Sequence, residues 1–376
     1  MRKLTFIFII LTTFACNEKK IEAKKPETEI FIEQSMDRNA DSLLNNKGFG
    51  SLSIGIYKNG KTFTKHYGEL DNGKGNKPND STIYEIASLT KTFTGTLLAK
   101  AELDGKLNLD DDIRKYLKGD FPNLEFERKP ITIKDIATHT SRLPRELPNS
   151  DDLWANSNDS LPYRLNELAR GYTKEMFYED LKKAKLDTLP GYKYAYSNVG
   201  PELIAQILEN VYNQSYDRLL EEIIFNKAGM RSTTFHLSQE QKKRLANGYN
   251  DKGDLAPNFV VALSGADGGL KSTMSDLMKY MEFQFNKENP IVTQSHQLMA
   301  YEDDRHFREG YFWQIRTNEE LGTYYFCHGG AYGTQNYFFL IPKHKLGISV
   351  ITNQSGPETS NELIVVVNGL IEDLKT

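Results

Sequence analysis

Apolar and polar residues follow a helical period at the start of the chain and a strand period soon afterwards. Apolar side chains recur at helical spacing from Ile32 to Leu44, which predicts a helix that ends at Gly48. Two β-rich runs, 51–57 and 62–67, then flank Asn59-Gly60, a dipeptide typical of tight hairpin turns. The chain therefore begins with a helix and two antiparallel strands.

The strand pattern returns near the C-terminus after a long helical stretch. Residues 88–224 are predicted to be mostly helical, with loops that include the polar segment 149–162. Later runs predict three strands and a closing helix, at 324–328, 335–341, 346–352 and 362–374. Strands at both ends predict an α+β fold, with one sheet built from about 29–85 and 265–376 and a helical subdomain inserted over about 86–264.

The N-terminal segment has the pattern of an export signal. Positive charges precede an apolar run, 4–15, that is shorter than the ~20 residues of a membrane-spanning helix. The run ends at Ala15-Cys16, which resembles a bacterial lipobox, so residues 1–15 are predicted to be a signal peptide and Cys16 a lipid anchor. The alternative is a plain signal peptide that ends near a cysteine. Residues 16–28 are charged and read as a tether to the domain 29–376, which predicts an envelope lipoprotein at the outer membrane or facing the periplasm.

The amino-acid composition excludes several classes of protein for this chain. The 376 residues are 39% hydrophobic and 26% charged, as in an ordinary globular protein, and the formal net charge of −4 offers no broad basic surface for nucleic acid. Two cysteines exclude a disulfide scaffold and a cysteine-based zinc cluster, and Cys327 has no intramolecular partner if Cys16 is acylated. No metal or cofactor is expected, and the oligomeric state is left open.

A serine and a lysine stand at the start of one predicted helix, in the tetrapeptide 88–91 (SLTK). Lys91 lies one turn after Ser88, so its amine can reach the hydroxyl. A serine hydroxyl becomes a good nucleophile when a neighbouring base takes its proton, and a helix N-terminus favours the developing negative charge. The alternative is a helix cap followed by a surface lysine.

Two further motifs follow in the chain. Tyr196-Ser197-Asn198 lies on a predicted loop that leads into a helix, where a tyrosine could pass protons and an amide could bind a substrate carbonyl. His328-Gly329-Gly330 ends a predicted strand, and its glycines would let a substrate backbone approach closely. Each motif is weak alone, because similar tripeptides elsewhere in the chain read as turns.

The three motifs, in this order, resemble those of the penicillin-recognising serine hydrolases. The resemblance is to the branch that holds class C β-lactamases, Streptomyces-type DD-peptidases, D-aminopeptidases and related esterases. Similar segments extend it from Ile32 to the C-terminus, namely 104–111 (DGKLNLDD), 131–144 (ITIKDIATHTSRLP), 265–270 (GADGGL) and 272–273 (ST). The family fold is a five-stranded antiparallel sheet with helices on both faces and a mostly helical domain, with the site between them.

The resemblance implies a role for each matched residue. Ser88 would form an acyl-enzyme, Lys91 and Tyr196 would share the proton transfers, and Asn198 would orient the substrate amide. The remaining substrate-binding residues would be His328, Gly329, Gly330 and Ala331. The backbone N–H groups of Ser88 and Ala331 would form the oxyanion hole.

The chain departs from the family pattern at a few positions. His328 stands where class C β-lactamases carry a lysine, and Gly329 lacks the hydroxyl of the K-T-G form, which favours the DD-peptidase and D-aminopeptidase side of the branch. Arg142 replaces a family glycine after Ser141, and Asp267 stands where the family often has a shorter A-G-G-L segment; neither residue has an evident role. His139 is predicted to be structural, and Trp154 to border the pocket.

The leading hypothesis is a lipid-anchored serine hydrolase that cleaves amide or ester bonds, with D-amino-acid-containing peptides of the cell wall as the expected substrates. The alternatives are a class C-like β-lactamase, a carboxylesterase, and a protein that binds penicillin or peptides without turning them over. In each, the partner is a small peptide, ester or β-lactam.

Overall fold

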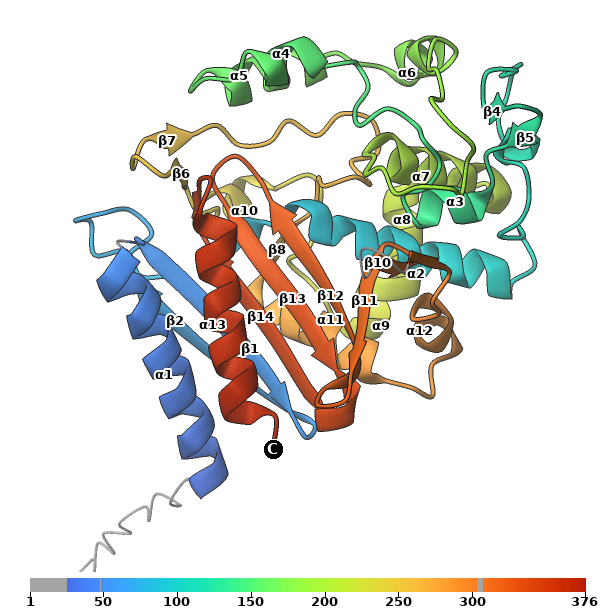
Figure 1. Ribbon diagram of the computed structural model, residues 1–376. Helices are drawn as coiled ribbons and strands as arrows, with labels where there is room; N and C mark the ends of the chain where they lie inside the picture. Colours follow the sequence, from blue (N-terminus) through green and yellow to red (C-terminus); the bar gives the residue numbers. More distant parts are fainter. Residues whose placement is uncertain (1–25, 48, 303–306) are drawn as a thin grey trace, which may run out of the picture.

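The strand-like runs at the two ends of the chain pair with each other in one antiparallel sheet. The computed structural model describes residues 26–47, 49–302 and 307–376, so the predicted signal peptide and Cys16 lie outside the described residues (Figure 1). Its large sheet has the strand order β2-β1-β14-β13-β12-β11-β10-β9. The strands are β1 (Ser51–Lys58), β2 (Lys61–Gly68), β9 (Ala300–Glu302), β10 (Phe307–Gly310), β11 (Trp313–Asn318), β12 (Gly322–Gly330), β13 (Gln335–Ile341) and β14 (Leu346–Thr352).

The five predicted strands are all present, and the predicted antiparallel sheet is confirmed. The hairpin turn has Asn59 at φ 53° and Gly60 at φ 84°, the left-handed conformation that a two-residue turn of this kind needs. Three strands beyond β12 were not predicted, namely β11, β10 and β9. The smaller pairings join β3 (Ile83–Glu85) to β8 (Lys271–Thr273), β4 (Glu125–Phe126) to β5 (Lys129–Pro130), and β6 (Gly248–Asn250) to both β7 (Leu255–Ala256) and β15 (Gln354–Ser355).

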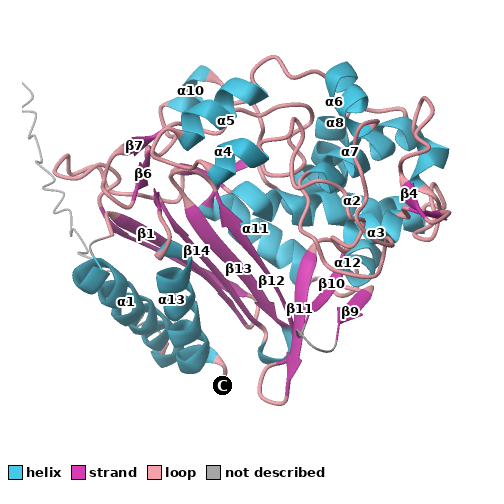
Figure 2. Cartoon of the chain, turned by 45° about the horizontal axis from the view of Figure 1, so that its top comes forward, coloured by secondary structure: helices cyan, strands magenta, loops and turns pink. Residues whose placement is uncertain are grey.

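Helices cover both faces of the sheet (Figure 2). The first and last helices, α1 and α13, pack side by side on one face, and α11 packs on the other. The helices are α1 (Glu27–Lys47), α2 (Thr90–Leu103), α3 (Ile133–Ala137), α4 (Asp151–Ala155), α5 (Leu161–Ala169), α6 (Lys174–Leu181), α7 (Val199–Tyr212), α8 (Tyr216–Leu220), α9 (Asn226–Ala228), α10 (Gln239–Lys242), α11 (Met274–Phe285), α12 (Pro290–Ser295) and α13 (Thr359–Leu374). Within the described residues, none has the length and apolar character needed to cross a bilayer.

The segment 149–162, predicted to be a loop, is partly helical. It contains α4 and the start of α5. Acidic residues occupy the first turn of α4, which suits a helix N-terminus, but none of its residues is buried. The indole Nε1 of Trp154 donates to Glu146 Oε2 at 3.3 Å, so a tertiary contact holds a helix that has no apolar periodicity of its own.

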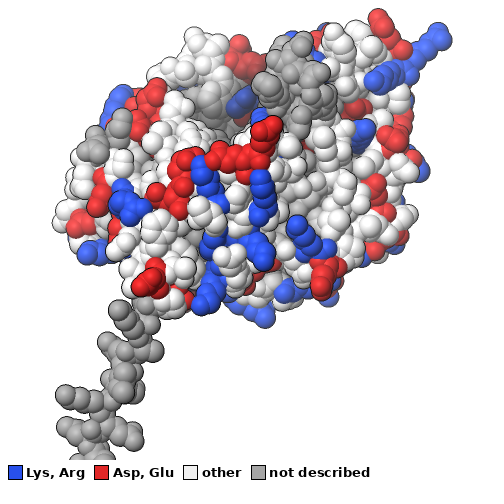
Figure 3. Space-filling model, turned by 60° about the horizontal axis from the view of Figure 1, so that its bottom comes forward, with Lys and Arg blue, Asp and Glu red and all other residues white. Residues whose placement is uncertain are grey.

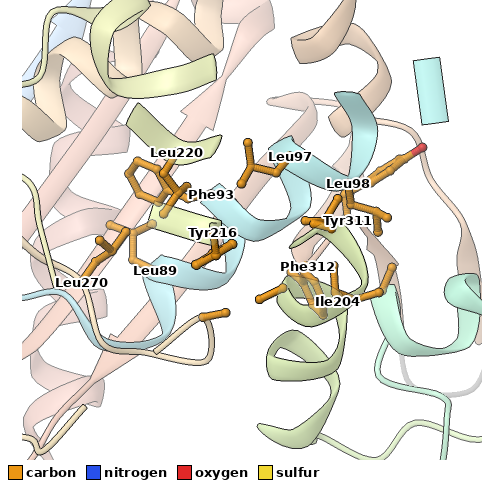
Figure 4. Packing of buried hydrophobic residues seen from close by; sticks show 14 of the residues in the cluster. Leu89, Phe93, Leu97, Leu98, Ile204, Tyr216, Leu220, Leu270, Tyr311 and Phe312 are labelled. Atoms are coloured by element: carbon orange, nitrogen blue, oxygen red, sulfur yellow. The ribbon is translucent and has the colours of Figure 1, made fainter. Parts of the chain in front are cut away.

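The helix that follows the predicted nucleophile is the centre of the main core. Helix α2 is buried on almost every side, and Figure 4 shows Phe93 and Leu97 among side chains of α7 and α8. The Phe93 ring stacks on Tyr280 of α11 with 3.8 Å between ring centroids. A second core lies between the other sheet face and the helices α1 and α13. Because α2 is held from all sides, the residues at its N-terminus have a fixed position.

Candidate active site

Ser88 lies in a tight turn between β3 and α2. Residues Ala87–Leu89 form a short 3₁₀ helix that runs directly into α2. Ala87 has φ 46°, a left-handed conformation that a residue with a side chain seldom adopts. Strained backbone of this kind is found at sites where the surrounding fold fixes a side chain for function.

Ser88, Lys91 and Tyr196 meet around one hydroxyl. Lys91 Nζ donates to Ser88 Oγ at 3.0 Å, and Ser88 Oγ lies 2.7 Å from the phenol oxygen of Tyr196. Lys91 also donates to the backbone carbonyl of Asp267. The ammonium lies 5.0 Å from the centre of the Tyr196 ring. The sequence motifs predicted this proximity, and the arrangement provides a nucleophile with two groups able to exchange its proton.

The loop that carries Tyr196 is fixed by buried polar contacts. Ser197 donates its backbone N–H to His139 Nδ1 at 3.3 Å and its hydroxyl to the Pro144 carbonyl at 2.6 Å. The His139 ring lies 4.5 Å from the Tyr196 ring, centre to centre. Burial, with Lys91 nearby, lowers the pKa of His139 to about 3, so its ring is neutral at physiological pH. His139 therefore supports the loop, as expected from the sequence.

Asn198 stands at the N-cap of α7 and borders the cleft. Its backbone N–H donates to the Arg145 carbonyl at 2.7 Å, and its Nδ2 donates to Glu146 Oε1 at 3.5 Å. Its side-chain oxygen is buried and has no hydrogen-bond donor in the described part of the chain. An acceptor left free at the edge of a cleft suits a substrate N–H group.

The C-terminal end of β12 forms another wall of the cleft. His328 Nε2 lies 2.5 Å from Gln335 Oε1 on β13, and Gln335 in turn donates to Ser355 Oγ at 2.9 Å. Burial lowers the pKa of His328 below its usual value. The Ala331 N–H donates to the Thr334 carbonyl at 2.9 Å, so this half of the predicted oxyanion hole is engaged within the turn. A substrate oxygen would have to displace or share that hydrogen bond.

These residues line one cleft of about 940 Å³ between the sheet and the helical part. Its polar part holds Ser88, Tyr196, Asn198 and His328. Gly330, Ala331 and Trp154 also line it, as predicted, whereas Gly329 is buried beneath. An apolar arm continues between α5 and the segment 259–263, lined by Leu161, Leu165, Leu168, Phe259, Val260 and Leu263. The cleft is large enough for a peptide of several residues or an extended acyl group.

Several residues of the site could not be found from the motifs. Glu146 accepts hydrogen bonds from Asn198, Ser150 and Trp154, yet in the sequence it is one acidic residue in a polar loop. Glu202 lies in the first turn of α7, where an acidic residue is common, so the sequence does not distinguish it from a surface residue. Gln335 is the first residue of a predicted strand, and nothing in the sequence marks it as part of the site.

No triplet of His, Cys, Asp or Glu side chains in the described residues is arranged to hold a metal ion. Cys327 is a free, buried thiol whose Sγ lies 3.5 Å from the Ser88 carbonyl oxygen, and burial raises its pKa to about 12. It therefore packs behind the nucleophile as a protonated thiol.

A model of the beta-lactamase family matches residues 36–367 of this chain. The chain belongs to the beta-lactamase family. This confirms the family predicted from the three motifs, whose members are serine hydrolases.

Two curated relatives within the beta-lactamase family are similar over most of this chain. Protein flp of Staphylococcus aureus (strain N315) is 30% identical over 332 residues, which cover 85% of this chain and 63% of that protein. The D-alanyl-D-alanine-carboxypeptidase/endopeptidase AmpH of Escherichia coli (strain K12) is 31% identical over 274 residues, which cover 71% of this chain and 66% of that protein. The match thus spans less than two thirds of each relative's length.

Solved structures of the family share the fold. A beta-lactamase/D-alanine carboxypeptidase from Yersinia pestis, complexed with citrate, superposes with a TM-score of 0.78 at 24% identity and covers 93% of this chain and 100% of its own. A class C beta-lactamase superposes with a TM-score of 0.76 at 21% identity and covers 94% of this chain and 98% of its own. The α+β fold predicted from the sequence is thereby confirmed.

Proposed function

We propose that this protein is a serine hydrolase that forms an acyl-enzyme on Ser88 and cleaves D-amino-acid-containing peptides of the cell wall. The observation that carries the proposal is the position of Ser88 Oγ, within hydrogen-bonding distance of both Lys91 Nζ and Tyr196 Oη. A hydroxyl held between two such groups can lose its proton as it attacks and can return a proton to the leaving group.

In this mechanism Ser88 Oγ attacks the carbonyl carbon of the scissile bond, and its proton passes to the Lys91–Tyr196 pair. The tetrahedral intermediate places its negative charge on the former carbonyl oxygen, near the Ser88 backbone N–H at the start of α2. Collapse breaks the C–N or C–O bond, and the leaving amine or alcohol takes up the proton. Water then attacks the acyl-enzyme by the same proton path and frees Ser88.

Features of the cleft favour a peptide substrate. The free side-chain oxygen of Asn198 can accept a peptide N–H, and the strand end at Gly330 leaves room for an extended backbone. The relative AmpH is named a D-alanyl-D-alanine-carboxypeptidase/endopeptidase, which agrees with this substrate class. The lipid anchor at Cys16 and the envelope location belong to the same proposal, because wall peptides lie outside the cytoplasm.

A carboxylesterase is the second candidate, and the apolar arm between α5 and the segment 259–263 favours it. Such an arm would hold the acyl chain of an ester better than a polar peptide. The two candidates differ in a simple assay. An esterase should cleave short p-nitrophenyl esters and leave D-alanyl peptides intact, whereas the proposed peptidase should cleave the peptides.

The intact mass of residues 17–376 after incubation with a penicillin tests the nucleophile, beside the same protein with Ser88→Ala. We expect one persistent penicilloyl adduct on the wild type and none on the variant, because the methyl group cannot attack. An adduct on Ser88→Ala at full strength would refute the assignment of Ser88. Recovery of hydrolysed penicillin would favour the β-lactamase alternative, and intact penicillin without an adduct would direct the assays to D-peptides and esters.

A further inference from the structure

Two carboxyl groups that interact with each other, those of Glu202 and Asp267, border the same cleft as the nucleophile. Glu202 of α7 is almost fully buried, and its Oε2 accepts hydrogen bonds from the Ser264 N–H at 3.1 Å and the Ser264 hydroxyl at 2.6 Å. Its Oε1 accepts the Asp267 N–H at 3.4 Å. The side chains of Glu202 and Asp267 also hydrogen-bond to each other. Two ionised carboxylates in hydrogen-bonding contact would repel each other, so one proton shared between them is the stable arrangement.

The proton belongs mainly to Glu202. Burial, followed by the charge of Asp267, raises the pKa of Glu202 to about 8. Burial also raises the pKa of Asp267, while the Lys91 ammonium counteracts the rise. Glu202 is therefore neutral at physiological pH and can donate to the Asp267 carboxylate, which carries the single negative charge of the pair.

Asp267 connects this pair to Lys91. Its backbone carbonyl accepts a hydrogen bond from Lys91 Nζ, the atom that also donates to Ser88 Oγ. The turn that carries Asp267 also contacts α2, because the Thr94 hydroxyl donates to the Ala266 carbonyl at 3.1 Å. A displacement of Asp267 would therefore move a hydrogen-bond acceptor of Lys91.

The other ionisable groups around the pair do not replace this charge. Tyr216 faces Glu202, Glu146 and Tyr332 face Asp267, and His139, Cys327 and Tyr196 face Lys91. Burial keeps His139 neutral and the Cys327 thiol protonated. Burial likewise raises the pKa of Tyr216 and Tyr332, so both phenols stay neutral. Glu146, whose charge also raises the pKa of Asp267, is held by hydrogen bonds from Asn198, Ser150 and Trp154.

We propose that Glu202 and Asp267 form a proton-sharing carboxyl pair that positions Lys91 against Ser88, so that the pair limits the reaction at alkaline pH. The inference rests on the proposed function, since it requires Lys91 to serve the acylation of Ser88. Both acids are positioning residues. When Glu202 loses its proton, the pair carries two negative charges, its internal hydrogen bond is lost, and repulsion displaces the Asp267 turn from Lys91.

The test is the pH dependence of kcat/KM for p-nitrophenyl acetate between pH 5 and 9, with the acetylation of Ser88 followed by intact mass. The wild type should lose activity as the pH rises through about 8. Glu202→Gln mimics the protonated acid, so its alkaline decline should disappear, leaving it up to about tenfold more active than the wild type at pH 9. Asp267→Asn removes the charge and should reduce kcat by about 10²-fold while KM changes little.

Two further variants make the outcome decisive. Ser264→Ala removes a hydrogen bond that favours the ionised form of Glu202, so the alkaline decline of this variant should move to higher pH. This variant tests the proposal if Glu202→Gln does not fold. Asp135→Asn is the matched control, since Asp135 is a buried carboxyl that caps α3 without contact to Lys91, and its pH profile should keep the wild-type shape.

A wild-type alkaline decline in Glu202→Gln, or a wild-type kcat in Asp267→Asn, would overturn the positioning role while leaving the nucleophile in place. A wild type that cleaves neither the ester nor a D-alanyl-D-alanine peptide, and acquires no acetyl group on Ser88, would instead overturn the proposed function, and this inference with it.

Discussion

His328 determines how the cleft treats a negatively charged substrate. Its ring is partly buried and hydrogen-bonded to Gln335, and its pKa is lowered by that burial, so it is uncharged at neutral pH. A β-lactam carries a carboxylate that a neutral imidazole attracts only weakly. The residue thus favours substrates that do not need a permanent cation at this position.

We therefore expect His328→Lys to increase the rate of penicillin acylation of Ser88 at pH 7 by about tenfold, the effect of one added charge-assisted hydrogen bond of about 1.4 kcal/mol. The rate is measured by intact mass over time. His328→Gln, which has a neutral side chain of similar reach, is the control and should show no gain. An equal rate in all three proteins would mean that the charge at this position does not select the substrate.

The sequence alone predicted some residues of the site and missed others for a physical reason. Ser88 and Lys91 are one helical turn apart, so their contact follows from local geometry, and Tyr196 could be added because the three motifs occur together in the order of the family. Glu202 and Asp267 meet only through the packing of α7 on a distant turn, which no local pattern encodes. The role of Arg142 also depends on a contact between distant residues. Arg142 adopts φ 64° where a glycine is usual, and its side chain binds Asp187 through two N–H groups.

At the scale of elements, the end of β12 is fitted closely against the turn that carries the nucleophile. A Cβ atom placed on Gly329 would lie 2.3 Å from the Ile86 carbonyl oxygen, which belongs to rigid backbone two residues before Ser88. A Cβ atom on the next residue, Gly330, would meet only the end of the Gln335 side chain, at 3.0 Å. Replacement by alanine should therefore be unfavourable at Gly329 and tolerated at Gly330.

Gly329→Ala should destabilise the protein by about 1–3 kcal/mol and slow the acylation of Ser88. The added methyl group would force β12 away from the turn that carries Ser88. Gly330→Ala should unfold at a temperature close to that of the wild type, since a small shift of the end of the flexible Gln335 side chain makes room for the methyl group. Thermal unfolding by circular dichroism compares the two variants. Equal unfolding temperatures would show that β12 is not fitted against the Ser88 turn as described.

The elements with strong local signals were predicted, and those held by tertiary contacts were not. The hairpin β1–β2 and the strands β13 and β14 carry turn signals and β-branched or aromatic runs, which favour strands in any context. β9 and β10 have three and four residues, so they hold too few side chains for a recognisable alternation. α4 is also short, and its contact with Glu146 lies outside its own sequence.

At the scale of the whole molecule, a second buried histidine makes the fold sensitive to acid. The ring of His296 stacks on Tyr325 with 4.3 Å between ring centroids, its Nε2 has no hydrogen-bond partner within the described residues, and burial lowers its pKa to about 3. In the unfolded chain the same residue takes up a proton below about pH 6.5. Its contribution to stability is complete above that pH and is lost as the pH falls toward 3.

His296→Phe keeps the stacked ring and removes this proton uptake. The stability of the variant relative to the wild type should therefore grow by up to about 1.4 kcal/mol for each pH unit below 6.5. Urea unfolding at several pH values between 4 and 8 measures the difference. His236→Phe, a change at an exposed histidine, should give a difference that does not vary in this way. A constant difference for His296→Phe would show that the ring is protonated in the native state.

The first helix enters the fold at the end of the sheet opposite the cleft. Glu29 in its first turn pairs with Lys61 beside the hairpin turn, where Lys58 also binds the backbone carbonyl of Leu374. The cleft lies at the other ends of the same strands, about 20 Å away along β14. The face where the chain enters shows Lys and Arg side chains gathered among acidic ones (Figure 3). If Cys16 is lipidated, the attachment point leads into the end of the domain opposite the cleft, so the opening of the cleft lies on the side of the domain away from the anchored end.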